Sequence, residues 1–216
     1  MIALKPLLKS VSPPLAAELE RRAHVRSFAA NEELFAQGED AAFLPIVVSG
    51  RVKMLHYLEP GKEVIIGIFE EGEMFAVPPV FDGKTYPSTA VAMERSKLMI
   101  LGRDQFLELI RKSDEFAFAV IGWMCEMLRE KTSTIQTLAT ASPEQRVGNV
   151  LLKLAAREDK EGPVKITLRR RDIAEMAGLT TETTIRVIRN LAAKGMIEIV
   201  HGKVLVDPHG PLSRRR

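Results

Sequence analysis

Residues 180–191, near the C-terminal end of the chain, combine threonine, glutamate, arginine and asparagine at spacings that suit one face of a helix. Apolar Ile185, Ile188 and Leu191 recur at three-residue steps and predict a buried stripe on the opposite face. The polar residues expected to face outward are Thr181, Glu182, Thr183, Arg186, Arg189 and Asn190. Carboxylates accept hydrogen bonds and guanidinium groups donate them in pairs, which matches the acceptors and donors at the edges of nucleotide bases. The segment therefore favours hydrogen-bonding chemistry directed at nucleic acid.

The preceding residues supply an element that would position this helix. Residues 171–177 have the pattern of a short helix, and its inward-facing residues are predicted to be Ile173, Ala174 and Ala177. Gly178 is expected to end this helix, because glycine adopts left-handed backbone angles at little cost, and Thr180 is expected to cap the next one. Two helices joined by a short glycine turn predict a helix-turn-helix, whose second helix enters the DNA major groove. The alternative is an ordinary helical hairpin with a solvated charged face.

The residues that follow favour the first interpretation. Residues 196–200 alternate like a strand, His201 and Gly202 form a tight turn with Lys203, and residues 204–206 return as a second strand. Residues 166–168, before the first helix, are expected to complete this small sheet. A helix-turn-helix followed by a β-hairpin is a winged helix, with Lys203 at the tip of the wing, where a DNA phosphate would sit.

This C-terminal segment resembles the DNA-binding domain of the CRP/FNR family of transcription regulators. The family's order Glu-Thr-x-x-Arg is matched by Glu182, Thr183 and Arg186, and the resemblance implies that Glu182 accepts from cytosine and Arg186 donates to guanine. Cyclic-AMP-type relatives carry arginine where this chain has Thr181, so a TTGA-like half-site of the FNR-like relatives is expected. The expected DNA contacts are Arg170, Thr180, Thr181, Glu182, Thr183, Arg186, Arg189 and Lys203.

Charge is divided unevenly along the 216 residues, although the net charge is only +3. Residues 142–216 hold 15 Lys and Arg against 9 Asp and Glu, whereas residues 1–141 hold 16 against 19. A basic C-terminal third fits one domain that touches a polyanion and one that does not. The single cysteine excludes a disulfide framework and an iron–sulfur cluster. Neither a signal peptide nor a membrane-spanning segment is evident, so we expect a cytoplasmic protein without a membrane partner.

The N-terminal half has a different sequence pattern, in which short β-prone segments are separated by turn residues. The clearest runs are residues 43–48, 51–58, 63–69, 88–93 and 98–101. Such spacing predicts an antiparallel roll or barrel, and within the family it resembles the cyclic-nucleotide-binding β-roll. We therefore expect an α+β chain with three parts: a β-roll sensor domain over residues 1–113, a long dimerisation helix over residues 114–141, and a winged helix-turn-helix over residues 142–216.

The long helix carries apolar residues at steps of three, four and seven residues, which predicts a coiled-coil seam between two copies of the chain. The expected seam is Ala117, Ile121, Met124, Leu128, Ile135 and Leu138, with Lys131 dividing its seven-residue step. The alternative is that this stripe packs on the chain's own β-roll. A second apolar face could serve that packing instead, so that both packings can be accommodated; it consists of Phe116, Phe118, Val120 and Trp123. Cys125 is expected to be a small buried hydrophobic residue, with a redox switch as the alternative.

The signal that the β-roll senses is the open question. In cyclic-AMP-binding relatives a Gly-Glu-Leu stretch and a later Arg-Ser pair hold the nucleotide, and the corresponding residues here are Gly72-Glu73-Met74 and Pro87-Ser88, followed by Thr89. The arginine that would neutralise the phosphate is missing, which disfavours cyclic AMP in the usual pose; Gly72-Glu73 also fits a plain turn. Lys131 and Thr132 align with effector contacts of relatives, and an anionic effector bridging two copies of Lys131 is one hypothesis. The other is that Lys131 extends outward to Glu130 or Glu126 of the partner chain.

The residue types and motifs of the sequence leave some function classes open and exclude others. An atypical cyclic-nucleotide-responsive regulator and a haem-based sensor of nitric oxide or redox state stay open as alternatives. We expect no enzyme, because His56 is the only histidine in the predicted strand region between residues 43 and 101 and no Ser-His-Asp, Walker or Rossmann pattern occurs. The resemblance implies double-stranded DNA, a second copy of the chain, RNA polymerase and an unidentified small effector as partners.

Overall fold

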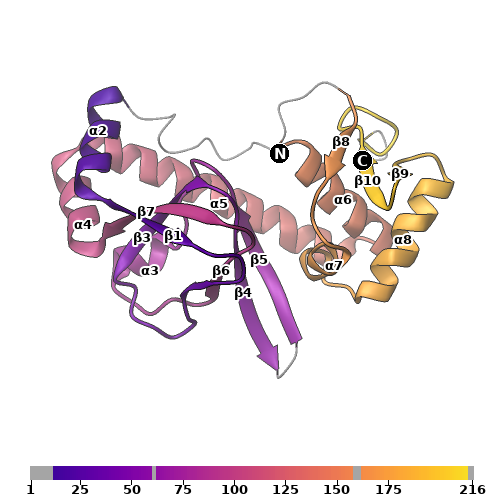
Figure 1. Cartoon of the computed structure of the whole chain (residues 1–216), viewed down its shortest axis with the longest axis horizontal. Coiled ribbons are helices and arrows are strands. Elements are labelled where there is room, and N and C mark those ends of the chain that lie inside the picture. The colour runs from indigo at the N-terminus through magenta and orange to yellow at the C-terminus, as the bar shows by residue number, and fades with distance from the viewer. Residues whose placement is uncertain (1–11, 60–61, 158–161, 214–216) are drawn as a thin grey trace. The chain divides into compact units, whose positions relative to one another are not determined.

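The computed structural model describes residues 12–59, 62–157 and 162–213 (Figure 1). The chain divides into two compact units, and the boundary falls within the long helix α5 (Asp114–Thr140), between Leu128 and Arg129. We describe each unit by itself. Within the described residues, no helix is both long and apolar enough to cross a membrane.

The N-terminal unit is built on two antiparallel sheets. Its strands are β1 (His24–Phe28), β2 (Glu33–Phe35), β3 (Phe43–Ser49), β4 (Val52–Glu59), β5 (Lys62–Phe69), β6 (Thr89–Ala92) and β7 (Ser96–Gly102). One sheet has the order β1-β7-β3 and the other the order β2-β6-β4-β5, and every pair in them is antiparallel. The predicted antiparallel β-structure is thereby confirmed, and the five predicted runs correspond to β3 to β7. The edge strands β1 and β2 were not among those runs, because β1 is largely exposed and β2 has three residues.

Four helices accompany these sheets in the described part of this unit. They are α2 (Pro13–Arg22), α3 (Val77–Asp82), α4 (Arg103–Lys112) and the first half of α5. Arg22 of α2 donates to Glu108 of α4 at 2.9 Å, and Ser12, just before α2, donates its hydroxyl to Glu115 of α5 at 2.8 Å. These bonds hold the N-terminal helix against α4 and the start of α5.

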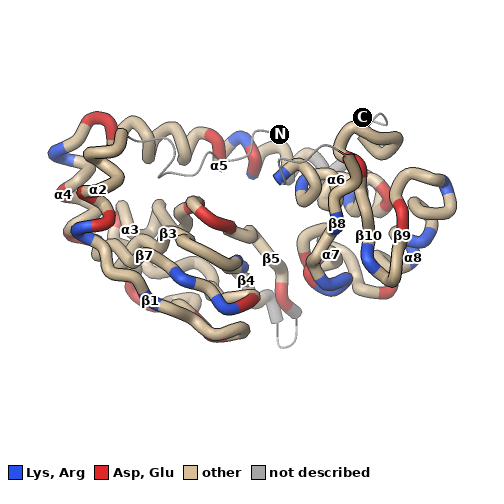
Figure 2. Tube along the Cα trace, turned by 45° about the horizontal axis from the view of Figure 1, so that its top comes forward, with Lys and Arg blue, Asp and Glu red and all other residues tan. Residues whose placement is uncertain are grey.

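The C-terminal unit consists of helices around a small sheet. Its elements after α5 are α6 (Pro143–Ala155), β8 (Val164–Ile166), α7 (Arg170–Ala177), α8 (Thr181–Ala193), β9 (Glu198–Val200) and β10 (Lys203–Val206). The sheet has the order β8-β10-β9, with Val204 paired to both Ile166 and Ile199. The predicted strand at residues 166–168 begins and ends two residues earlier, because the chain leaves the sheet after Ile166 to reach the cap of α7. Figure 2 shows basic residues on α7, α8 and β10 of this unit.

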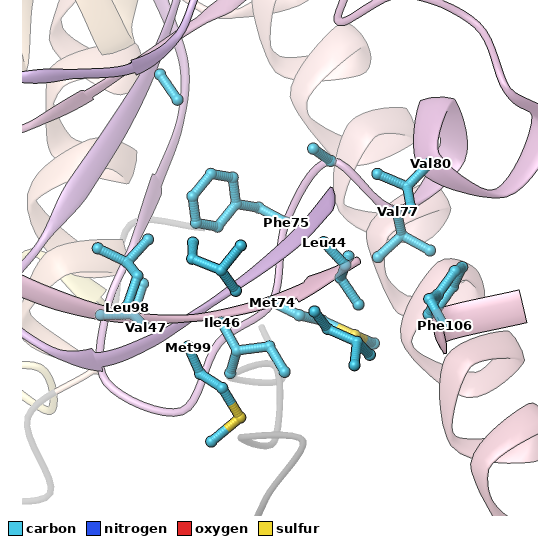
Figure 3. Packing of buried hydrophobic residues seen from close by; sticks show 14 of the residues in the cluster. Leu44, Ile46, Val47, Met74, Phe75, Val77, Val80, Leu98, Met99 and Phe106 are labelled. Carbon is cyan, nitrogen blue, oxygen red and sulfur yellow. The ribbon is translucent and has the colours of Figure 1, made fainter. Parts of the chain in front are cut away.

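The core of the N-terminal unit explains why the sheets hold together. Ile46 and Val47 of β3 pair with Met99 and Leu98 of β7, and all four side chains are buried. Figure 3 shows them beside Met74 and Phe75, with Val77 and Val80 of α3 and Phe106 of α4 closing one end. Burial of such side chains contributes about 1.5–3 kcal/mol each before conformational entropy is subtracted. This apolar packing is the main stabilising contribution in the unit.

Candidate nucleic-acid interface

The helix-turn-helix forms where the sequence predicts it. Gly178 ends α7 with left-handed angles of φ 63° and ψ 41°, and the backbone N–H of Leu179 donates to the Ala174 carbonyl at 3.0 Å. Thr180 caps α8, since its Oγ1 accepts a hydrogen bond from the backbone N–H of Thr183 at 3.2 Å. This cap satisfies one of the donors that every helix leaves open at its N-terminus. The end predicted for the first helix and the cap predicted for the second are therefore confirmed, while α8 continues two residues beyond Leu191, to Ala193.

The buried stripe of α8 differs from the predicted one. The residues that face inward are Thr184, Val187, Ile188 and Leu191, whereas Ile185 is only half-buried. A helix turns about 100° per residue, so each three-residue step from Ile185 to Leu191 moves the side chain back by about 60°. Residues spaced by three and four stay on one face, which is the pattern that starts at Thr184. A threonine in a buried position carries no apolar signal, so this pattern was missed.

The outward face of α8 presents a polar surface. Glu182, Arg186, Arg189 and Asn190 are exposed, and Thr181 and Thr183 are partly exposed. Glu182 lies in the first turn, and Arg186 follows one turn later on the same face. An acceptor and a fork of donors stacked along the N-terminal half of a capped helix have the spacing needed to reach the edges of neighbouring bases.

The wing stands beside this helix pair as a two-residue hairpin. His201 and Gly202 both have positive φ angles, 47° and 75°, as a tight turn between right-twisted strands requires. Lys203 is exposed immediately after the turn and pairs with Val200 across the hairpin. Arg170, the first residue of α7, donates from Nη2 to the Gly202 carbonyl at 3.1 Å. Burial lowers the pKa of the Arg170 guanidinium, which nevertheless keeps its charge at neutral pH.

Six of the residues predicted to contact an effector lie in two places in the N-terminal unit, and the other two, Lys131 and Thr132, lie in the C-terminal unit. Gly72 and Glu73 form a turn against β3, where the Gly72 N–H donates to Val47 at 2.7 Å and the Glu73 carboxylate accepts from the Glu70 N–H at 2.7 Å. Met74 is fully buried beside Ile46. This segment thus adopts the turn that its sequence also allows, and the Glu73 carboxylate stabilises it.

The second group leads into β6 of the other sheet. Pro87 is exposed and Ser88 is buried, while Thr89 accepts a hydrogen bond from the Gln37 N–H at 3.0 Å. The ring Nδ1 of His56 lies 3.1 Å from the Pro87 carbonyl oxygen. Lys131 and Thr132 lie exposed on α5 within the C-terminal unit. No group of three or more histidine, cysteine, aspartate or glutamate side chains that could hold a metal occurs in the described residues.

The predicted seam on α5 is only partly an exposed face. Ile121, Leu128 and Ile135 are 54%, 61% and 67% exposed, but Met124 is half-buried against the core of the N-terminal unit and Ala117 is also half-buried. The side chain of Leu138 lies outside the described ones. Of the second apolar face, Phe116, Val120 and Trp123 are buried as expected, whereas Phe118 is 73% exposed and joins the outer face.

Cys125 also departs from its prediction. It is exposed on α5, not buried. Phe118, Ile121, Cys125 and Leu128 follow one another at steps of three and four residues, so they share one face of the helix. The spacing of apolar residues along α5 allows two neighbouring rows of side chains as the exposed face, one containing Met124 and one containing Cys125. The β-sheet core packs against the side with Met124 and leaves the row with Cys125 exposed.

Both halves of the chain match known protein families. Residues 25–113 match the cyclic nucleotide-binding domain, and residues 145–210 match the Crp-like helix-turn-helix domain. The cyclic AMP receptor protein of Thermus thermophilus is 29% identical over 84% of this chain and 82% of its own length. A CRP-like cAMP-activated global transcriptional regulator of Mycobacterium tuberculosis is 25% identical over 100% of this chain and 98% of its own.

A solved structure gives the same result for the fold. The structure of FixK2 from Bradyrhizobium japonicum has a TM-score of 0.78 with 23% identity, and the match covers 86% of this chain and 92% of that one. The two relatives and this solved structure each cover more than four fifths of the chain. The chain belongs to the CRP/FNR family of transcription regulators, with a Crp-like helix-turn-helix that binds DNA and a ligand-sensing domain of the cyclic-nucleotide-binding type.

Proposed function

We propose that the chain binds an inverted-repeat DNA site as a homodimer, and that a signal acting on the N-terminal unit sets its affinity for that site. The observation that carries this proposal is the outward face of α8, where Glu182 and Arg186 lie one turn apart behind the Thr180 cap. Arg186 donates to guanine and Glu182 accepts from cytosine within a TTGA-like half-site. Lys203 on the wing contacts a phosphate and adds affinity without sequence preference.

The homodimer is supported by the outer face of α5. Phe118, Ile121, Leu128 and Ile135 are more exposed than large apolar residues usually are, and they follow a seven-residue repeat that suits a two-stranded coiled coil. A two-fold dimer places two recognition helices about one DNA turn apart, which is what an inverted repeat requires. Members of this family bind DNA typically as dimers, and they recruit RNA polymerase at promoters; we infer the same partner here.

The ligand differs from cyclic AMP held in the usual pose. Relatives named for cyclic AMP include those from Thermus thermophilus and Mycobacterium tuberculosis. In this chain the position of the phosphate-binding arginine is Pro87, which offers no charge and no N–H donor. An effector that needs no arginine fits these pocket residues better. An atypically bound cyclic nucleotide and haem are two examples.

Fluorescence anisotropy with labelled duplexes tests the DNA part of the proposal. We expect Arg186→Ala to lose about 1–3 kcal/mol of binding free energy on a TTGA-like inverted repeat and to relax the preference at one base pair of each half-site. Lys203→Ala is the matched comparison, because it should weaken binding to specific and scrambled duplexes alike. If Arg186→Ala weakens both duplexes equally, Arg186 makes no base contact and the assignment of α8 is wrong.

A further inference from the structure

Arg170 was expected to contact DNA, but its guanidinium is engaged within the protein. It begins α7 and lies 32 residues from Gly202 in sequence, yet its Nη2 donates to the Gly202 carbonyl at 3.1 Å. The side chain is half-buried between the helix start and the wing turn. This hydrogen bond, from a charged donor, joins the helix-turn-helix to the hairpin at the residue next to Lys203.

The turn that receives this bond depends on few other constraints. It consists of His201 and Gly202 alone, and the strand β9 beside it is exposed at all three of its residues. Two-stranded hairpins are marginally stable by themselves. On its other side β10 is held by β8, which pairs with residues 204–206 but not with the turn. The guanidinium of Arg170 therefore acts at the part of the wing that the sheet constrains least.

We propose that Arg170 is a positioning residue, which fixes the wing turn relative to α7 and thereby holds Lys203 where it meets the DNA backbone. This inference rests on the proposed DNA contact of Lys203. The planar guanidinium suits the task, because it keeps its charge when partly buried and its donors lie in a rigid fork. Arg170 thus contributes to DNA affinity through the wing and not through a phosphate of its own.

Hydrogen–deuterium exchange of the full chain without DNA directly tests whether the Arg170–Gly202 hydrogen bond stabilises the wing turn. Arg170→Met keeps an unbranched apolar stem and removes every donor, so exchange of a peptide covering residues 198–206 should become about tenfold faster, as expected for losing a hydrogen bond to a charged group. Lys165→Ala is the control, since it removes a positive charge from exposed β8 without touching the turn. Peptides from α6 report whether the variant is still folded. Unchanged exchange in a folded Arg170→Met variant overturns the proposal.

A double-mutant cycle on DNA affinity separates positioning from direct contact. If Arg170 acts through the wing, Arg170→Met should weaken DNA binding in the wild-type background and have little effect once Lys203→Ala is present. Independent phosphate contacts predict that the two losses multiply and that each lowers the slope of log affinity against log salt by about one; that result overturns the proposal. If Lys203→Ala alone leaves DNA affinity unchanged, the proposed contact of Lys203 with a phosphate is wrong. The exchange experiment then still decides whether Arg170 stabilises the wing turn.

Discussion

Thr184 is completely buried on α8, and its hydroxyl has no hydrogen-bond partner among the described residues. A hydroxyl in that position has lost its water without gaining a replacement, which costs about 1–3 kcal/mol. Valine has the same branched shape with a methyl group in place of the hydroxyl, and its helix propensity is nearly the same. We therefore expect Thr184→Val to stabilise the C-terminal unit by about 1–2 kcal/mol.

The gain should be visible in thermal unfolding of the full chain. In a domain of roughly this size each kcal/mol raises the melting temperature by about 4–8 °C. Trp123 is the only tryptophan and belongs to the N-terminal unit, so its fluorescence should report a transition that does not move. Circular dichroism or calorimetry should show the shifted transition of the helix-turn-helix. DNA affinity should stay within about twofold, because Thr184 has no exposed surface.

Val187→Thr is the reciprocal variant, since Val187 is buried one turn further along the same stripe. Adding a hydroxyl there should cost about 1–3 kcal/mol. A loss of stability in Thr184→Val, or no change, would show that the Thr184 hydroxyl is satisfied in solution. The reasoning from its missing partner would then be refuted.

Three other changes test separate parts of the structure. Burial raises the pKa of Tyr86 to about 12, so as the pH rises its phenol ionises in the unfolded chain before it ionises in the folded one. The free energy of unfolding should therefore fall between about pH 10 and 12, by up to about 2–3 kcal/mol. Urea titrations of Tyr86→Phe should show a smaller fall over the same range. Leu128→Glu places a charge on the exposed face of α5 and should give monomers with little operator affinity; sedimentation of an unchanged dimer would contradict the proposed seam. Gly178→Ala forces a side chain into left-handed angles and should cost about 1–2 kcal/mol of stability in the same titrations.

The sequence determined most of the fold because its strongest signals are local. Gly178 and Thr180 specify a turn and a cap through backbone preferences that need no distant partner, and both lie where the sequence places them. The wing followed from the His201-Gly202 turn for the same reason. Strand β1 was missed because its residues alternate weakly and pair with β7, 68 to 76 residues later in the chain. Such pairing depends on the whole sheet, and no short window of sequence contains it.

The faces of helices were harder to predict than the helices themselves. On α5, the rows containing Met124 and Cys125 are adjacent, and both satisfy a repeat of three and four residues. The sheet core selects one, since it takes up Phe116, Val120 and Trp123 and leaves Phe118 and Cys125 outside. On α8, the apolar residue Ile185 suggested a stripe one position away from the buried Thr184. In both helices the deciding information is three-dimensional packing, which amphipathic spacing constrains only to within one residue.

The arrangement of α8 separates stability from specificity. Thr184, Val187, Ile188 and Leu191 hold the helix against the unit, and Glu182, Arg186 and Arg189 lie on the face that they leave open. Because a helix of about 3.6 residues per turn keeps these sets apart, exchanging an outward residue changes no core contact. Surface substitutions away from special features shift stability by about 0.5 kcal/mol or less, whereas one lost base contact costs about 1–3 kcal/mol of discrimination. Under the proposed base contacts of Glu182 and Arg186, sequence preference can therefore change at these two residues while the same core keeps α8 in place.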